Sequence, residues 1–232
     1  MNARYESWGR YPQSMAAEIF QPANFNDIPL LNNLDHSVLA FGLGRSYGDS
    51  CLNDNGILVD TKGLSKLYDF DRQRGIIRCE AGLSLADILA TIVPHGWFLP
   101  VLPGTKFVTV GGAIANDIHG KNHHRAGTFG CHIPQFELLR SDGGRLLCSP
   151  EQNKDFYEAT IGGLGMTGLI LWADIQLKPV RSALIEAESI RFKNLDAFFE
   201  LSETSDKKFE YTVAWIDGLV IGKNLGRGIF MG

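Results

Sequence analysis

Short apolar runs bounded by glycine organise the chain from residue 38 onward. The runs Val38–Phe41, Ile57–Asp60 and Ile76–Glu80 are mostly apolar, and each is followed by turn-forming residues. Runs of this length with glycine on either side are typical of β-strands rather than helices. We therefore predict three strands in the first half of the chain.

The pattern then changes to helical spacing. Apolar residues recur three or four positions apart within Leu85–Ile92, and Ser84 stands directly before them. Serine at this position can cap the first turn of a helix, and the following Pro94 and Gly96 would end it. The segment predicts a short helix that buries one face.

Two further apolar runs, Phe136–Arg140 and Arg145–Cys148, flank the turn sequence Ser141–Gly144. Strand-forming runs around Asp-Gly favour an antiparallel hairpin. After it, Phe156–Ile161 predicts a short helix and Leu169–Leu177 predicts a longer strand.

The rest of the chain continues in the same mixed way. Beyond Pro179 the pattern predicts a strand, a helix over Leu195–Ser202 and a strand over Tyr211–Ile216, whereas the first 35 residues look irregular. Because strands and helices are mixed without long β–α–β alternation, we predict an α+β fold.

A domain boundary is expected near Lys178–Arg181. We assign residues 1–179 to a first domain and residues 180–232 to the start of a second. The last stretch, Leu225–Gly232, has no polar tail and no helix stop, which indicates that the second domain is truncated. Phe230 and Met231 are then expected on exposed surface.

Composition narrows the class of protein. The 232 residues include 22 basic and 26 acidic side chains, with a net charge of −4, and 44% of residues are hydrophobic. These values are ordinary for a folded globular protein, and the mild acidity argues against a general nucleic-acid binder. The four cysteines show no C-x-x-C spacing, so we expect free thiols in a cytoplasmic setting. Neither a signal peptide nor an apolar run of the roughly 20 residues that span a bilayer is evident.

Candidate chemistry begins at Phe41–Asp49, which reads Phe-Gly-Leu-Gly-Arg-Ser-Tyr-Gly-Asp directly after a predicted strand. Glycines let backbone N–H groups converge on an anion, and Ser46 adds a hydroxyl donor. The segment is not a Rossmann fingerprint, because Tyr47 stands where the third glycine is needed and no amphipathic helix follows. An anion-binding loop and a plain surface turn both remain open on these residues alone.

A formal G-x-G-x-x-G occurs at Gly163–Gly168. A predicted helix precedes it and a predicted strand follows it, which is the reverse of the order that the nicotinamide fingerprint requires. We interpret it as a close backbone approach to some other ligand.

The most unusual segment is Leu102–His124. Its small residues at Gly111–Ala115 would let the start of a helix press against a flat or charged group, and three histidines then follow within nine residues. His119 and His123 have the i, i+4 spacing that a zinc site could use, but the nearby glycines argue against a helix and no H-E-x-x-H is present. We favour a hydrogen-bonding wall around a polar heterocycle or a sugar over a metal site.

Taken together, these segments resemble FAD-linked oxidases of the vanillyl-alcohol oxidase/p-cresol methylhydroxylase (PCMH) type. The matching segments are Gly42–Asp49, Val101–Thr105, Val108–Ala115, Asp117–His124, Gly162–Gly168 and Tyr211–Asp217. The string Asp-Ile-His-Gly-Lys-Asn-His-His at Asp117–His124 is the most specific of them. Within the superfamily the chain is most similar to the branch that oxidises a prenyl-phosphate-linked ribose.

The resemblance implies a PCMH-type fold in which FAD lies between two α+β subdomains, followed by an incomplete substrate domain. The diphosphate would lie in the Gly42–Gly48 loop, with Gly111–Ala115 completing the cradle and Asn116–Lys121 running toward the flavin ring. The implied cofactor-binding residues are Leu43, Gly44, Arg45, Ser46, Tyr47, Gly48, Pro103, Gly104, Thr105, Gly111, Gly112, Ala113, Ala115, Asn116, Ile118, His119, Gly168 and Ile170.

One departure from the wider family is informative. Related sugar-alcohol and lactone oxidases carry a histidine in the glycine loop that is covalently joined to the flavin, and here Arg45 holds that place. A guanidinium cannot form that bond, so the resemblance implies non-covalent FAD.

The resemblance further implies an FAD-dependent oxidoreductase that oxidises a secondary alcohol of a sugar by hydride transfer to flavin N5. The substrate would be a sugar or a lipid-linked sugar of the kind that supplies cell-wall arabinan, met at most peripherally at a membrane. A short-chain reductase would be its partner.

Lys121 is our candidate for holding a substrate phosphate or hydroxyl, Tyr47 for presenting its hydroxyl to the substrate, and His119 for orienting the flavin ring. A solvated lysine, a loop-anchoring tyrosine and a structural histidine are the alternatives. Because family members continue past the point where this chain stops, a flavin-binding fragment without catalysis of its own is the second hypothesis. A histidine-cluster metalloprotein is the third. The electron acceptor and the oligomeric state stay open.

Overall fold

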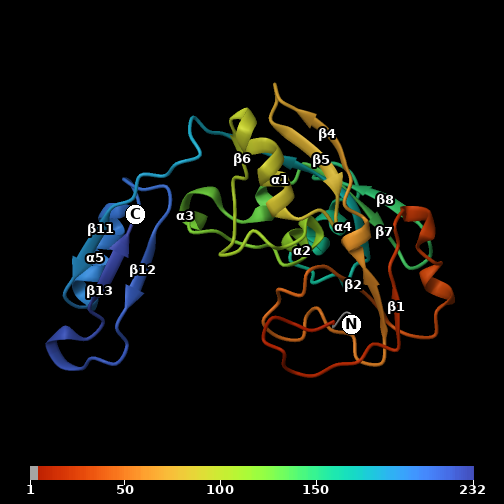
Figure 1. Ribbon diagram of the computed structural model, residues 1–232, viewed down its shortest axis with the longest axis horizontal. Coiled ribbons are helices and arrows are strands. Elements are labelled where there is room, and N and C mark those ends of the chain that lie inside the picture. The colour runs from red at the N-terminus through yellow and green to blue at the C-terminus, as the bar shows by residue number, and fades with distance from the viewer. Residues whose placement is uncertain (1–4) are drawn as a thin grey trace.

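The computed structural model describes residues 5–232, and a five-stranded antiparallel sheet forms its largest element (Figure 1). The strand order is β4-β5-β9-β7-β8. The bounds are β4 Leu67–Asp71, β5 Ile76–Glu80, β9 Leu169–Gln176, β7 Gln135–Leu139 and β8 Arg145–Cys148. The predicted hairpin of β7 and β8 is confirmed, with Glu137 opposite Leu147. β4 is an additional strand that the sequence pattern did not reveal.

One face of this sheet carries the main core. Helix α1, Leu85–Ile92, packs on it with Leu85, Ile88 and Ile92 fully buried. The sheet contributes fully buried side chains from three strands: Ile77, Cys79, Phe136, Leu138, Ala173 and Ile175. Side chains alternate along a strand. The residues between these buried positions therefore point to the opposite face of the sheet.

The helix begins and ends where the sequence predicts. The Ser84 hydroxyl accepts a hydrogen bond from the Asp87 N–H at 3.1 Å, which satisfies one of the free donors of the first turn. The 3-10 turn Val93–His95 contains Pro94, and Gly96 then adopts φ +77°, a left-handed conformation that favours glycine.

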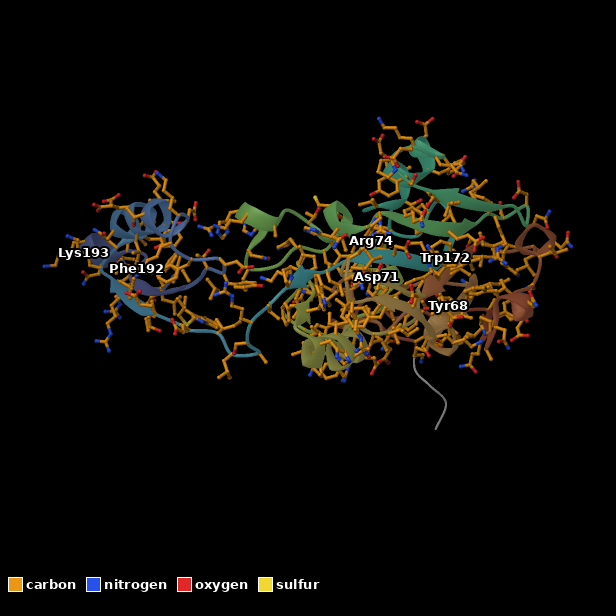
Figure 2. All side chains as sticks on the ribbon, turned by 90° about the horizontal axis from the view of Figure 1, so that it is seen from above. Tyr68, Asp71, Arg74, Trp172, Phe192 and Lys193 are labelled. Atoms are coloured by element: carbon orange, nitrogen blue, oxygen red, sulfur yellow. The ribbon has the colours of Figure 1, made fainter. Side chains whose placement is uncertain are left out.

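The opposite face of the sheet is polar and internally paired. Arg78 on β5 donates two hydrogen bonds to Asp174 on β9, at 2.7 and 2.8 Å. The Arg78 guanidinium also lies 4.4 Å from the ring centre of Trp172, whose indole N–H donates to Glu137 at 2.7 Å. Figure 2 labels Trp172 and, on β4, Tyr68, whose hydroxyl donates to the buried Glu80 at 2.6 Å. This face therefore holds its charges in specific pairs.

A second sheet consists of three parallel strands in the order β1-β3-β2. The bounds are β1 Glu18–Phe20, β2 Val38–Phe41 and β3 Ile57–Asp60. The prediction for β2 and β3 is confirmed, whereas β1 lies in the part expected to be irregular. Parallel neighbours need a long crossover connection, usually a helix. Here residues 42–56 make the crossover without any helix, and they include the glycine loop.

Short elements complete the body, which we define as residues 5–180. They are β6 Trp97–Phe98 paired with β10 Lys178–Pro179, helices α2 Val110–Ala115, α3 His123–Ala126 and α4 Lys154–Thr160, and 3-10 helices at Phe25–Asp27, Leu31–Asn33, Thr61–Gly63 and Phe129–His132. Helix α4 confirms the predicted helix, beginning two residues earlier than Phe156.

The remaining residues form a separate three-stranded antiparallel sheet in the order β11-β13-β12. We call it the C-terminal sheet; its bounds are β11 Ser189–Phe192, β12 Val213–Ile216 and β13 Gly228–Met231, with helix α5 Leu195–Ser205 and a 3-10 turn at Gly222–Asn224. Figure 1 shows it in blue at one end of the molecule, nearest to α3, and Figure 2 labels its Phe192 and Lys193 at the end far from Trp172.

The structure corrects one expectation in this region. Phe230 is only 2% exposed, because it lies on β13, a strand that the sequence pattern did not predict, in the middle of the C-terminal sheet. Met231 is half-buried. The exposed apolar side chains lie elsewhere on this sheet and its loops. The mixture of helices and antiparallel strands agrees with the α+β class, while the division into domains at residue 179 stays a prediction.

Few contacts join the C-terminal sheet to the body. The Thr212 N–H donates to the Lys121 carbonyl at 2.9 Å, and Arg125 donates to the Asp206 carbonyl at 2.7 Å. Lys178 pairs with Glu210 and donates to the Tyr211 hydroxyl at 2.9 Å. Separately, no helix among residues 5–232 combines the length and the apolar character needed to cross a bilayer.

Candidate functional site: a cleft bounded by three glycine segments

The main cleft of the body has a volume of about 620 Å³. Three glycine-bearing segments supply most of its wall: residues 42–51 after β2, residues 103–112 leading into α2, and residues 164–170 leading into β9. Clefts of several hundred cubic ångströms commonly hold cofactors or other small molecules.

The first wall is the glycine loop, and its shape depends on the N-terminal segment. Gly44 has φ +62°, and a Cβ there would lie 2.5 Å from the Glu6 carbonyl oxygen. The Trp8 N–H donates to the Ser46 carbonyl at 2.8 Å on the same side. Only glycine fits such a close approach of two backbones in this conformation. Among the described residues, the N–H groups of Gly44 and Arg45 donate to no protein acceptor, so they are available to a ligand.

The second wall is the turn into α2. The Thr109 hydroxyl accepts from the Gly112 N–H at 3.1 Å, which caps this short helix from within. The Gly111 N–H donates to the Ala81 carbonyl at 2.7 Å. These donors are therefore already satisfied, and the contribution of Gly111 and Gly112 to the cleft is a flat wall without side chains.

The third wall is strained. Leu164 has φ +52°, and Asp117 at the far end of α2 has φ +41°. Residues with a Cβ rarely adopt this region, and such strain is maintained only where the surroundings over-determine it. Two hydrogen bonds do so here: Leu164 N–H to the Ala115 carbonyl at 2.8 Å, and Gly130 N–H to the Asp117 carboxylate at 2.8 Å.

The charge in the cleft is simple. Of all the lining side chains among the described residues, only that of Arg45 carries a full charge. The other polar groups are the indole N–H of Trp8 and the hydroxyl, thiol and amide groups of Ser46, Tyr47, Ser50, Cys51, Thr61, Thr105, Thr109 and Asn116. Burial raises the pKa of the Cys51 thiol, so this group is protonated at neutral pH. The cleft thus offers one cation, open N–H donors and apolar walls to a ligand.

The structure brings together most of the predicted cofactor-binding residues. The predicted residues that line the cleft are Leu43, Gly44, Arg45, Ser46, Tyr47, Pro103, Gly104, Thr105, Gly111, Gly112, Ala115, Asn116, Ile118, Gly168 and Ile170. The side chain of Tyr47 is 82% exposed.

Three predicted residues do not line the cleft. Ala113 is fully buried, because it lies on the core side of α2 while Gly111, Gly112 and Ala115 lie on the other. His119 pairs with Thr128 in an isolated bridge, and its side chain is exposed outside the cleft lining. Gly48 is exposed on the outer part of its loop.

Lys121 also lies outside the lining. Its side chain is exposed, and its carbonyl accepts the Thr212 N–H, so the residue lies where the C-terminal sheet meets the body. The rings of His119 and His123 are 5.9 Å apart, edge to face. Across residues 5–232, however, no group of three or more histidine, cysteine or acidic side chains is placed to hold a metal ion.

Sequence reasoning missed several lining residues. Phe107, Val108 and Thr109 lie inside a segment that it singled out, and Leu164 and Gly165 lie inside the formal G-x-G-x-x-G, so a signal existed for them. Trp8 had none, because it reaches the cleft only through long-range contacts with the glycine loop.

The cleft, with one cation, open N–H donors and apolar walls, is compatible with a large anionic cofactor that carries a flat ring. The profile of a protein family described as "FAD binding domain" matches residues 28–149, over half of the chain, and the chain belongs to this family. This superfamily of FAD-linked oxidoreductases is the one that the glycine segments indicated.

Individual relatives agree with this assignment. The chain is 42% identical over 192 residues to decaprenylphosphoryl-β-D-ribose oxidase of Mycolicibacterium smegmatis, covering 82% of this chain and 42% of that protein. It is 26% identical over 210 residues to L-gulonolactone oxidase of Mus musculus, covering 86% of this chain and 47% of that protein. A match at 28% identity to Delta(24)-sterol reductase of Mus musculus covers 63% of this chain and 28% of the relative. The chain therefore spans less than half of the length of these relatives.

The residues present fit FAD. The open N–H groups of Gly44 and Arg45 and the Arg45 guanidinium can meet a diphosphate, while Leu43, Val108 and Ile170 offer apolar surface to a ring. Space for the cofactor is left by glycine: a Cβ built on Gly104 meets no atom within 4 Å and would project into open space beside the cleft.

Proposed function

We propose that this chain binds FAD non-covalently in the cleft and forms the flavin-bearing part of an oxidoreductase. Its substrate would be a secondary alcohol of a sugar, specifically a ribose linked to a prenyl phosphate. The observation that carries the proposal is a cleft walled by three glycine segments in which the one charged side chain among the described lining residues is a cation. The 42% identity to an oxidase of decaprenylphosphoryl-β-D-ribose supports the choice of substrate.

Non-covalent attachment follows from the side chains near the ligand. No histidine lines the cleft within the described chain, and Arg45 cannot form a bond to a flavin ring. Cys51 carries the one thiol among the described lining residues, but its raised pKa leaves little thiolate at neutral pH. Acid precipitation should therefore release all yellow colour into the supernatant, whereas a yellow pellet would contradict this part of the proposal.

The same thiol offers a check on where the cofactor binds. A thiol reagent should modify Cys51 slowly at pH 7 and faster as pH rises toward the raised pKa, because only the thiolate reacts. Saturating FAD should protect Cys51 and leave the exposed Cys131 as reactive as before. Peptide mass spectrometry of the modified protein distinguishes the two sites, and equal protection of both or neither would place the cofactor elsewhere.

In the reaction, bound FAD would supply the acceptor for the hydride that leaves the carbinol carbon, and the hydroxyl proton would pass to water. The chain's own residues would bind and orient the sugar. Tyr47 lies at the exposed edge of the cleft, where its hydroxyl can hydrogen-bond a sugar hydroxyl. Lys121, at the junction with the C-terminal sheet, can hold a phosphate or hydroxyl without belonging to the cofactor wall. Lys121→Ala should then slow flavin reduction and leave FAD bound.

The substrate class suggests the surroundings of the protein. A prenyl-linked sugar lies at a membrane surface, so the enzyme would make peripheral membrane contact at most. The free cysteines favour a cytoplasmic setting. A short-chain reductase that returns a hydride to the keto sugar would be a fitting partner.

Binding is tested first by titrating the apo-protein with FAD. Gly104→Val should raise the Kd at least tenfold, because its side chain enters the cleft without straining the backbone. Gly48→Val is the matched control: its Cβ also has open space, but the residue does not line the cleft, so its Kd should equal that of the wild type. Equal affinities for both variants would contradict the site.

Catalysis is tested by anaerobic mixing of the flavin-loaded protein with a prenyl-phosphoryl ribose, with the deoxy analogue that lacks the reactive hydroxyl as control. Loss of the yellow flavin absorbance with the ribose alone supports the oxidoreductase. A yellow protein that neither compound bleaches supports the second candidate, a flavin-binding part without catalysis of its own. The position of Lys121, which does not line the cleft, favours this second candidate.

A further inference from the structure

The N-terminal segment Ser7–Arg10 packs against the backbone of the glycine loop. Ser7 is buried, the Trp8 N–H donates to the Ser46 carbonyl at 2.8 Å, and a Cβ on Gly9 would lie 2.5 Å from the Tyr47 carbonyl oxygen. Trp8 itself lines both the cleft and a second hollow of about 490 Å³, and the two share the loop residues from Gly42 to Arg45. Its indole stays 59% exposed in this position.

Trp8 also contacts Arg45, the charged side chain of the described cleft lining. The Arg45 guanidinium carbon lies 5.2 Å from the centre of the indole ring, within the range of a cation–π contact. Arginine has a long side chain that loses rotamer freedom when it binds an anion. A guanidinium that is already stacked on an aromatic face loses less, because part of its orientation is fixed beforehand.

We infer that Trp8 is a positioning residue of the cofactor site: its indole orients Arg45 toward the diphosphate, while its backbone N–H, which a substitution of the side chain retains, holds the loop. The inference rests on the proposed FAD binding. Trp8 acts through Arg45, so its effect on affinity depends on the presence of that guanidinium. A residue that contacts the cofactor directly would instead contribute to affinity whether or not the Arg45 guanidinium is present.

A double-mutant cycle separates these two roles. We expect Trp8→Ala to raise the Kd for FAD about two- to fivefold and Arg45→Gln to raise it at least tenfold. In the double variant, loss of Trp8 should add nothing beyond Arg45→Gln, because the group that it positions is gone. If the fold-changes in Kd of the two single variants multiply in the double variant, the inference is overturned.

Fragments of the cofactor and conservative variants sharpen the test. ADP carries the diphosphate and riboflavin carries none, so both single variants should weaken ADP and leave riboflavin unchanged. Trp8→Phe keeps an aromatic face and should stay within about twofold of the wild type. Trp215→Phe removes an exposed tryptophan on the C-terminal sheet and should change nothing. Weaker riboflavin binding in Trp8→Ala would contradict a role through Arg45.

The inference and the proposed function fail in different ways. If the wild type binds no FAD at micromolar concentration, the proposed function fails. If the wild type binds FAD and Trp8→Ala, folded by circular dichroism, binds it equally well, only the inference fails. If Trp8→Ala does not fold, Trp8→Phe and Trp8→Leu decide: equal affinities for these two variants would overturn it, because leucine keeps apolar bulk without a π face.

Discussion

The body and the C-terminal sheet are built on the same plan but treat their second faces differently. Each has an antiparallel sheet with a helix packed on one face, α1 in the body and α5 at the C-terminal end. On the other face of the body, Arg78, Trp172 and Glu137 are held in a network of hydrogen bonds and ring contacts. On the other face of the C-terminal sheet, Trp215 and Ile229 lie side by side and remain 72% and 42% exposed.

This difference indicates which region carries the proposed cofactor site. All of the cleft-lining residues belong to the body, and the body's sheet has both of its faces satisfied, one by a core and one by polar pairs. The C-terminal sheet touches the body through a few hydrogen bonds near Lys121 and Lys178. We therefore expect cofactor binding to depend on the core of the body and to be insensitive to the C-terminal sheet.

The greatest loss of stability should come from removing a large side chain from the core of the body. Phe136 is fully buried and stacks on Tyr157 at 5.6 Å, so Phe136→Ala should lower the free energy of unfolding by about 3–5 kcal/mol. FAD binding should weaken with it. Chemical denaturation monitored by circular dichroism measures the first change, and FAD titration measures the second.

The matched variant is Phe230→Ala, which removes an equally buried phenylalanine from the C-terminal sheet. It should increase hydrogen exchange over Ser189–Phe192 and Gly228–Met231 while the Kd for FAD stays unchanged. If Phe230→Ala weakens FAD binding as much as Phe136→Ala does, the two regions form one cooperative unit and the comparison fails.

The same contrast explains how much the sequence could predict. Strands β2, β3, β5, β7, β8 and β9 and helix α1 follow from local patterns, because each has its own apolar rhythm, turn or cap. β1, β4 and β13 exist because of the partners they pair with: β4 has a mostly exposed apolar–polar mixture, and β13 carries glycine at its start. Such strands have little local signal.

The site divides in the same way. Glycine segments indicate a close approach of the backbone to a ligand. Most of the cleft could therefore be predicted from Gly42–Arg45, Gly104 and Gly111–Gly112. Which side of a short element faces the cleft could not, as Ala113 and His119 illustrate, because that depends on what packs behind it. Trp8 could not be found either, since more than thirty residues separate it from the loop that it supports.

A smaller effect is expected from the polar face of the body. Asp174 is buried and accepts from Arg78 and from the Gln135 amide at 2.8 Å. Asp174→Ala leaves these donors without an acceptor and should lower the free energy of unfolding by about 1–3 kcal/mol, since hydrogen bonds to a charged group are involved and Arg78 is partly solvated. Asp174→Asn, which keeps an acceptor of the same shape, should lower it by less. Equal losses for the two variants would mean that the pairing on this face contributes little beyond packing.

The smallest effect on stability should come from the exposed apolar face. Trp215 has most of its surface in water in the folded chain, so Trp215→Ser should change the free energy of unfolding by less than about 0.5 kcal/mol. Trp172→Ser is the control on the body, where the indole lies under the Arg78 guanidinium and donates to Glu137, and it should lower stability by about 2 kcal/mol. What Trp215→Ser should change is association: exposed apolar surface favours contact with other apolar surfaces, so the variant should bind less of a hydrophobic dye and sediment with less concentration dependence. A loss of stability as large as that of Trp172→Ser would show that Trp215 is packed in solution, and the two sheets would then differ less than their exposed faces indicate.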